Sequence, residues 1–267
     1  MMRKLNSIAL CGAVLALAVA ASGQTLKPGV ATVVRIQGEA RYALGDGIWH
    51  PLLVGRTLNA GAVIETGYDA TVDLVLGRTI AFPQAATWPD RIGPAPDAKV
   101  RGMIDYKPAV VQNMVRLTGG TILAIEKLTT GDTGVDAVSD TELDLKQGRI
   151  FCSVRKLSAA SEYLVKIPNG IAGVRGTLFE IDASGWCAAL KNSVMLAIIG
   201  PSGVPVTYQI DEGSQFNPET GQISPLTSDL LNALHQISTA LDTVYVEAVS
   251  FTYDGTFCFI SPTSGRR

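Results

Sequence analysis

Residues 143–182, which read LDLKQGRIFCSVRKLSAASEYLVKIPNGIAGVRGTLFEID, decide the fold of this chain. Ile150, Cys152 and Val154 alternate with other residues, and this period of two places all three on one face of a strand. Two further apolar runs follow, and the first ends at Pro168, because proline cannot donate to a strand ladder. Three short strands within one such segment predict an all-β fold.

The turn before the third strand is unusually rich in glycine. Gly170, Gly173 and Gly176 lie within seven residues, which indicates a backbone that needs positive φ or a close approach to another chain segment. Arg175 lies between two of these glycines and allows two interpretations. It either helps to bind an anion in the turn, or it pins the turn to its own sheet with Glu180 as a candidate partner. We favour the second interpretation, under which Arg175→Ala would cost about 1–3 kcal/mol of stability.

The same turn carries a resemblance to a known family, the FecR domain. Further residues like those of the family occur at 148–150 and in the N-terminal stretch 49–76, so that the resemblance covers residues 30–182, with an unmatched insertion at 83–113. It implies an all-β extracytoplasmic module that meets another envelope protein or a ligand. We interpret the motif as structural and assign to it Pro168, Gly173, Val174, Arg175, Gly176, Thr177 and Phe179.

The N-terminus resembles an export signal. Arg3 and Lys4 precede the apolar run 8–21, and small residues follow at a suitable cleavage position within residues 1–23. That apolar run is shorter than the ~20 residues that span a bilayer as a helix. We therefore expect a periplasmic or secreted protein without a membrane span, unless the signal stays uncleaved as an anchor.

The rest of the chain divides into two expected parts. Residues 24–182 form the FecR-like β domain, and residues 183–267 form a C-terminal β extension that includes strands at 244–253 and 256–260. The extension holds one amphipathic helix at 225–241, with Ser224 as its N-cap and Pro225 at its first position. Its apolar stripe consists of Leu226, Leu230, Leu234, Ile237 and Leu241.

An internal echo refines the fold class. Leu117-x-x-Gly120-x-Ile122 is repeated as Leu145-x-x-Gly148-x-Ile150, with a fainter copy at residues 74–80. A strand–glycine–strand unit that recurs cannot bury its apolar face alone, so neighbouring copies must cover it. The expected architecture is therefore a stack of short strands of roll-like, solenoid-like or sandwich character, with one C-terminal amphipathic helix.

The composition excludes several functions. The 267 residues carry a net charge of −2 without a basic tract, which argues against nucleic acid as a partner. The two histidines, His50 and His235, do not cluster with cysteines at metal-ligand spacing. The sequence also lacks a nucleophile elbow and a phosphate-binding loop. We predict no catalytic residue, no cofactor and no metal.

Two features leave alternatives open. Cys152, Cys187 and Cys258 could form one disulfide with one thiol left over, or they could all be small buried apolar residues. The carboxylate pairs Glu180/Asp182 and Asp211/Glu212 have separations that a glycosidase could use, although such pairs are common on solvated surfaces.

The sequence thus predicts an exported, non-enzymatic binding or signalling module of the cell envelope. Few residues precede the apolar run, so we expect the cytoplasmic anti-sigma segment of some FecR-like regulators to be lacking. The first alternative is a structural component of the envelope or surface that assembles through its sheet edges or the 83–113 insertion. The second is a polysaccharide hydrolase that would need Glu180 or Asp211 in a deep cleft.

Overall fold

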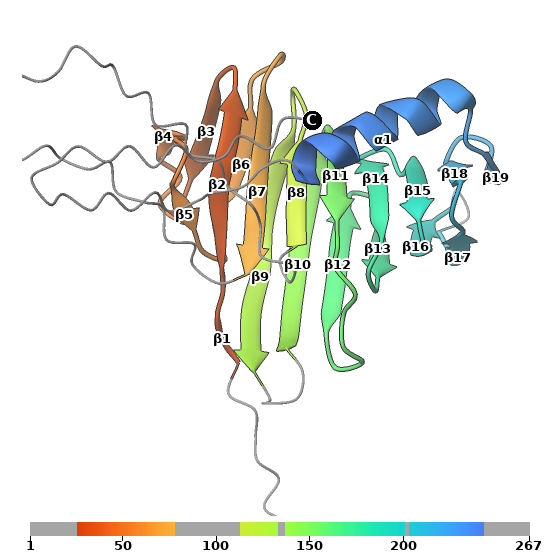
Figure 1. Ribbon diagram of the computed structural model, residues 1–267, viewed down its shortest axis with the longest axis horizontal. Helices are drawn as coiled ribbons and strands as arrows, with labels where there is room; N and C mark the ends of the chain where they lie inside the picture. The colour runs from red at the N-terminus through yellow and green to blue at the C-terminus, as the bar shows by residue number, and fades with distance from the viewer. Residues whose placement is uncertain (1–25, 78–112, 133–136, 201–202, 243–267) are drawn as a thin grey trace, which may run out of the picture.

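The fold was analysed in a computed structural model, which describes residues 26–77, 113–132, 137–200 and 203–242. Four features of the sequence analysis lie outside these residues. They are the signal segment, the 83–113 insertion apart from its last residue, the two predicted C-terminal strands and Cys258. The described residues form two stacked β-sheets and one helix (Figure 1). The predicted all-β class with one C-terminal helix is confirmed.

The first sheet, called sheet A, has ten strands in the described part of the chain. Neighbours in it pair antiparallel except β10 and β12, which pair in parallel because the chain passes through the other sheet between them. Its order is β17 (Pro205–Ile210), β16 (Val194–Ile199), β13 (Gly170–Val174), β12 (Glu162–Ile167), β10 (Ala137–Gln147), β9 (Ile122–Asp132), β6 (Val63–Thr66), β3 (Ala40–Ala43) and β4 (Trp49–Pro51), with β1 (Lys27–Pro28) beside β9.

The second sheet, called sheet B, has nine described strands, all paired antiparallel. Its order is β19 (Gln222–Pro225), β18 (Ser214–Asn217), β15 (Cys187–Lys191), β14 (Leu178–Asp182), β11 (Arg149–Ser153), β8 (Asn113–Leu117), β7 (Thr71–Gly77), β2 (Val30–Gln37) and β5 (Thr57–Leu58). The strands beyond residue 182 add to the same two sheets as the strands before it.

The two sheets enclose the main core. Alternate residues of the central strands point inward, as the period of two predicts. Leu143 and Val165 of sheet A and Ile150, Cys152 and Phe179 of sheet B are therefore fully buried in one cluster. Burying such a side chain contributes roughly 1.5–3 kcal/mol. The interior of the sandwich is therefore the main source of stability.

The internal echo marks two neighbouring corners where the chain crosses between the sheets. At Gly120 it passes from β8 to β9, and at Gly148 from β10 to β11. Gly148 has φ +79°, and a Cβ there would lie 2.6 Å from the Cα of Thr121, just after the other corner. Both a left-handed backbone and close packing require glycine at this position.

Helix α1 (Ser228–Asp242) forms a third layer on the outer face of sheet B (Figure 1). Leu234 and Leu241 are fully buried there, against a second apolar cluster that includes Val75, Met114 and Phe151. The predicted apolar stripe is confirmed. The described residues contain no helix that is both long and apolar enough to cross a bilayer.

The predicted start of this helix is wrong by three residues. Ser224 and Pro225 belong to β19, in which Pro225 pairs with Ser214. The N-cap is Thr227, whose Oγ1 accepts a hydrogen bond from the N–H of Leu230 at 3.4 Å. Strand pairing at the sheet edge outweighs the local Ser-Pro signal, which is typical of a helix start.

Candidate functional site

The glycine-rich turn is a corner between the sheets. Val174 ends β13 in sheet A, and Leu178 begins β14 in sheet B. Gly176 has φ +101°, and a Cβ there would lie 2.7 Å from the Cα of Lys156. The expectation of positive φ and close approach therefore holds at Gly176. It also holds in part at Gly170, where a Cβ would lie 2.2 Å from the carbonyl oxygen of Ala197.

Polar groups next to the arginine hold this corner in place. Thr177 is buried, and its Oγ1 donates to the carbonyl of Ser193 at 2.9 Å, while its own carbonyl accepts from the N–H of Val154 at 3.0 Å. The Nδ2 of Asn192 donates to the carbonyl of Gly176 at 2.5 Å. Asn192 itself has φ +58°, which asparagine tolerates better than most residues. The corner is thus fixed by hydrogen bonds from the segment that follows β11 and from the turn between β15 and β16.

Arg175 does not pin the turn, and that interpretation is wrong. Its side chain is exposed and forms no hydrogen bond or ion pair with any described residue. Val174, the last residue of β13, is buried in the core, whereas Arg175 lies in the exposed bend that follows the strand. The carbonyl of the bend already has Asn192 as its donor.

Glu180, the candidate partner of Arg175, lies on the outer face of sheet B instead. It is buried to 4% exposure, and its closest cation is Arg149 at 3.9 Å. Burial raises the pKa of Glu180 above its ordinary value; Arg149 opposes this shift, and Asp182 adds to it. The Arg149 guanidinium also lies 4.7 Å from the Trp186 ring centre.

Asp182 has a structural role at the end of β14. Its Oδ1 accepts hydrogen bonds from the N–H of Ser184 at 2.9 Å and the N–H of Trp186 at 3.2 Å, which closes the turn to β15. Its Oδ2 lies 3.4 Å from Arg149. The carboxylate is therefore committed to the turn and to one cation, which leaves little of it for acid–base chemistry.

Two lysines lie close to Arg175 and complete what we call the cationic bend, defined as Lys156, Arg175 and Lys191. Lys156 packs against Gly176, and Lys191 pairs with Leu178 three residues after Arg175. All three side chains are exposed, and none forms an ion pair within the described ranges. The bend is therefore a fixed scaffold that presents to solvent three cations with no ion-pair partner in the part of the chain that the structure describes.

The other motif residues have packing roles. Val174 and Phe179 are buried in the main core, and Pro168 lies exposed in the two-residue hairpin turn between β12 and β13. Gly173 has ordinary backbone space, since a Cβ there would meet only the Leu164 side chain at 3.4 Å. The motif thus combines core residues and a shaped corner with one cation that has no partner within residues 26–77, 113–132, 137–200 and 203–242.

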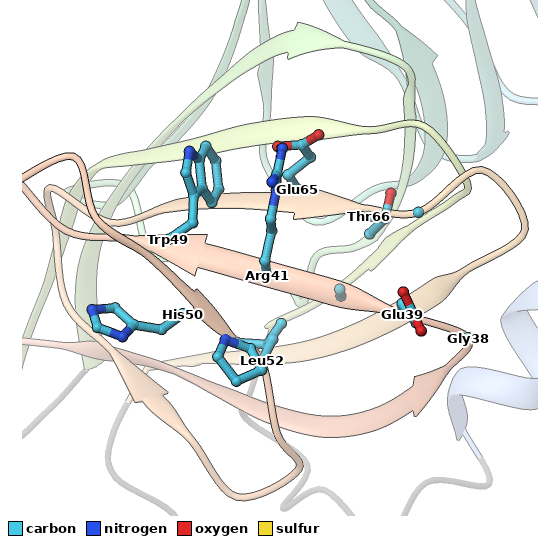
Figure 2. A pocket seen from close by; sticks show the side chains of 11 residues that line it. Gly38, Glu39, Arg41, Trp49, His50, Leu52, Glu65 and Thr66 are labelled. Atoms are coloured by element: carbon cyan, nitrogen blue, oxygen red, sulfur yellow. The ribbon is translucent and has the colours of Figure 1, made fainter.

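A second candidate is an open pocket near the β4 edge of sheet A (Figure 2). Arg41 crosses it and is already engaged, because it lies 2.7 Å from Glu65 and 4.6 Å from the Trp49 ring centre. His50 lines the pocket, and its ring centroid lies 5.4 Å from that of Tyr42 in a tilted arrangement. The lining contains no cysteine and no second histidine. The pocket contains neither Glu180 nor Asp211, so the carboxylates considered for hydrolysis do not converge there.

Sequence reasoning missed a buried ionic cluster under the end of α1. Asp73 is fully buried and accepts two hydrogen bonds from Arg116, at 2.7 and 2.8 Å. Arg35 lies 3.4 Å from the same carboxylate and donates to the carbonyl of Ala240 in the last helical turn. Asp73 lies between Val72 and Leu74, which both point into the main core, so strand alternation places it on the outer face of sheet B. The outer face of sheet B is buried at this position only because helix α1 packs over it.

The cysteines in the described residues are free and buried, in agreement with the interpretation as small apolar residues. Cys152 and Cys187 lie in the main core, and burial raises the pKa of Cys152 to about 12. No group of three potential metal ligands occurs among the described residues.

Comparison with known proteins agrees with the resemblance found in the sequence. The model of the family described as FecR protein matches residues 110–192, an interval that contains both echo corners and the cationic bend. The N-terminal stretch 49–76 lies outside the matched interval. No curated protein matches the chain.

Two crystal structures of a "putative anti-sigma factor" from Parabacteroides distasonis are similar to this chain. One is 15% identical to this chain, with a TM-score of 0.34, and the matched part covers 47% of this chain and 56% of the chain in that structure. The other is 14% identical, with a TM-score of 0.33, and the matched part covers 50% of this chain and 66% of the chain in that structure. The chain thus spans less than two thirds of the length of either structure.

Proposed function

Because residues 110–192 match the FecR family, a match that supports a signalling or regulatory module, we propose that this chain is an exported, non-enzymatic binding module of the cell envelope. In this proposal the cationic bend receives an acidic segment of a partner protein. One observation carries the proposal: the family-like motif holds Arg175 exposed on a rigid corner without a partner among the described residues.

The chemistry of the bend favours carboxylates. A guanidinium offers a planar fork of donors that matches a carboxylate, and lysines on either side add positive charge. The corner is fixed by Thr177 and Asn192, so binding would order little more than the three side chains. The chain as a whole is slightly acidic, with a net charge of −2, so a group of three lysine and arginine side chains differs from the chain's average.

The binding test uses a fluorescein-labelled polyglutamate peptide and fluorescence anisotropy at low salt. We expect binding that weakens as salt is added, because it depends on exposed charges. Arg175→Ala should weaken it about tenfold, which corresponds to ~1.4 kcal/mol, with an unchanged melting temperature. Lys127→Ala is the matched control, because Lys127 is exposed but already paired with Asp140 at 2.9 Å. Equal peptide affinities of wild type and Arg175→Ala would overturn the assignment of the bend.

Export is tested separately by fractionation and N-terminal sequencing. The protein recovered from the periplasm or medium should begin after the small residues that end the 1–23 segment. Recovery of the full chain from the cytoplasm alone would count against the envelope location, whatever the peptide experiment shows.

A further inference from the structure

The edge of sheet A at β17 is long and carries no charge. From Gly200 to Ile210 the sequence contains no Asp, Glu, Lys or Arg. Strand β17 lies at one end of the row of strands (Figure 1), and its residues are exposed over most of its length. Natural edge strands are usually protected by charges, bulges or covering segments. Pro205 at the start of β17 is the one such device in this strand.

The hydrogen-bond pattern shows which residues face the open side. The N–H of Gly200 donates to the carbonyl of Val204, and the N–H of Ile199 donates to Asn169 on the opposite side. With the register Ile199↔Pro205 and Ala197↔Thr207, the alternation directs the backbone groups of Thr207 and Gln209 away from β16. These groups have no backbone partner among the described residues.

This edge is complementary to itself. If two copies of β17 pair antiparallel about a two-fold axis at Tyr208, each Thr207 lies opposite Gln209 of the other copy. Both residues present outward N–H and C=O groups, so the two pairs form four backbone hydrogen bonds. In this register Pro205, which lacks an N–H, lies beyond the two hydrogen-bonded pairs. It lies opposite Asp211 of the other copy, so no two like charges are paired across the interface.

Apolar side chains beside the edge favour the same pairing. Ile199 is 54% exposed and Met195 46% exposed, both on the outer face of β16. Val206, the partner of Ile198, is 42% exposed on the opposite face of the edge strand. Pairing through β17 would cover part of the apolar surface on both faces. This apolar surface borders uncharged backbone groups, so it suits a second copy of the same chain better than a charged ligand.

We propose that this protein forms a two-fold symmetric dimer by antiparallel pairing of β17 with β17 of a second copy. One edge of six residues buries less than the roughly 1,200–2,000 Å² of a stable interface, so the dimer is weak and concentration-dependent. The dimer joins two copies of sheet A into one continuous sheet, at a site distinct from the cationic bend.

Sedimentation equilibrium over a concentration series of the mature chain tests the dimer. We expect a monomer at about 1 μM that becomes a dimer toward a few hundred micromolar, as a small interface implies. Thr207→Pro removes an outward N–H without removing a bond to β16, so it should abolish the dimer and leave the melting temperature within about 2 °C of wild type.

Thr207→Ala is the matched control, because it keeps the N–H and should dimerise as wild type does. A wild-type chain that stays monomeric throughout the series would overturn the proposal. Equal dimerisation of Thr207→Pro and Thr207→Ala would overturn it as well, since a different surface would then join the copies.

Discussion

At the scale of single residues, the polar groups of this protein divide into those that hold the fold and those that are free to act. Thr177 and Asn192 hold the corner at residues 174–178, whereas Arg175 contributes no contact among the described residues. Glu180 and Asp73 lie under the helix layer, where each carboxylate depends on an arginine. Substitutions at these positions should therefore have very different effects.

Thr177→Val should destabilise the protein although it conserves shape. The valine cannot donate to the carbonyl of Ser193, which the threonine hydroxyl reaches at 2.9 Å, so we expect a loss of about 1–2 kcal/mol in urea unfolding. Arg175→Ala should change the free energy of unfolding by less than about 0.5 kcal/mol. The reverse order of the two losses would restore the view that the arginine pins the corner.

The buried carboxyl group of Glu180 should make the stability of the protein depend on pH. Its pKa in the folded state is raised by burial, so the native protein binds more protons than the unfolded chain between the two pKa values. The free energy of unfolding should therefore fall as pH rises from the ordinary glutamate range through the raised value. Glu180→Gln should remove this fall and be at least as stable as wild type at neutral pH. The comparison is made by urea unfolding across pH 4–8, and a parallel pH profile of wild type and variant would contradict the prediction.

At the scale of elements, corners and the helix layer contribute differently from the strands. Gly148→Ala should cost more than about 2 kcal/mol, because it combines φ +79° with a contact of 2.6 Å to the Thr121 backbone. Gly47→Ala is the matched comparison: it has φ +71° and open space around it, so only about 1 kcal/mol of backbone strain remains. Chemical denaturation of both variants measures the difference, and equal losses would show that crowding at the corner relaxes freely.

Helix α1 should open separately from the sandwich. It contacts sheet B through the smaller apolar cluster and is joined to the main core only through that sheet. Leu234→Ala should lower the free energy of helix docking by about 2 kcal/mol or more and speed hydrogen exchange of the α1 amides, while β10 and β11 stay protected. Leu143→Ala, in the main core, should speed exchange in both regions. Uniform loss of protection in the Leu234 variant would mean that the layers unfold as one unit.

At the scale of the whole molecule, noncovalent packing joins the two sheets in the described residues. Cys152 and Cys187 are free and buried, and the raised pKa of Cys152 keeps its thiol protonated at neutral pH. In a Cys258→Ser variant we expect the same melting temperature with and without reductant. A thiol reagent should label the two buried cysteines only after denaturation. Rapid labelling of the native protein would show that the sandwich opens.

Local sequence determined a large part of this architecture. The period of two in residues 150–154 predicted that Ile150, Cys152 and Val154 share one face, and all three line the main core, because strand alternation needs no knowledge of the partner strand. The Leu-x-x-Gly echo predicted repeated strand units, since a left-handed corner admits little but glycine. The FecR resemblance followed mainly from the glycine-rich turn that holds Arg175.

Tertiary structure alone decided the roles of the charged residues. Arg175 has no partner among the described residues, and the carbonyl of Gly176 in its bend instead accepts a hydrogen bond from Asn192 in the turn between β15 and β16. Asp73 is buried only because α1, more than 150 residues later, covers its face of sheet B. The open edge at β17 likewise depends on which strand ends the sheet. Periodicity assigns a residue to a face, whereas burial and pairing of that face depend on distant segments, and a local pattern holds no information about them.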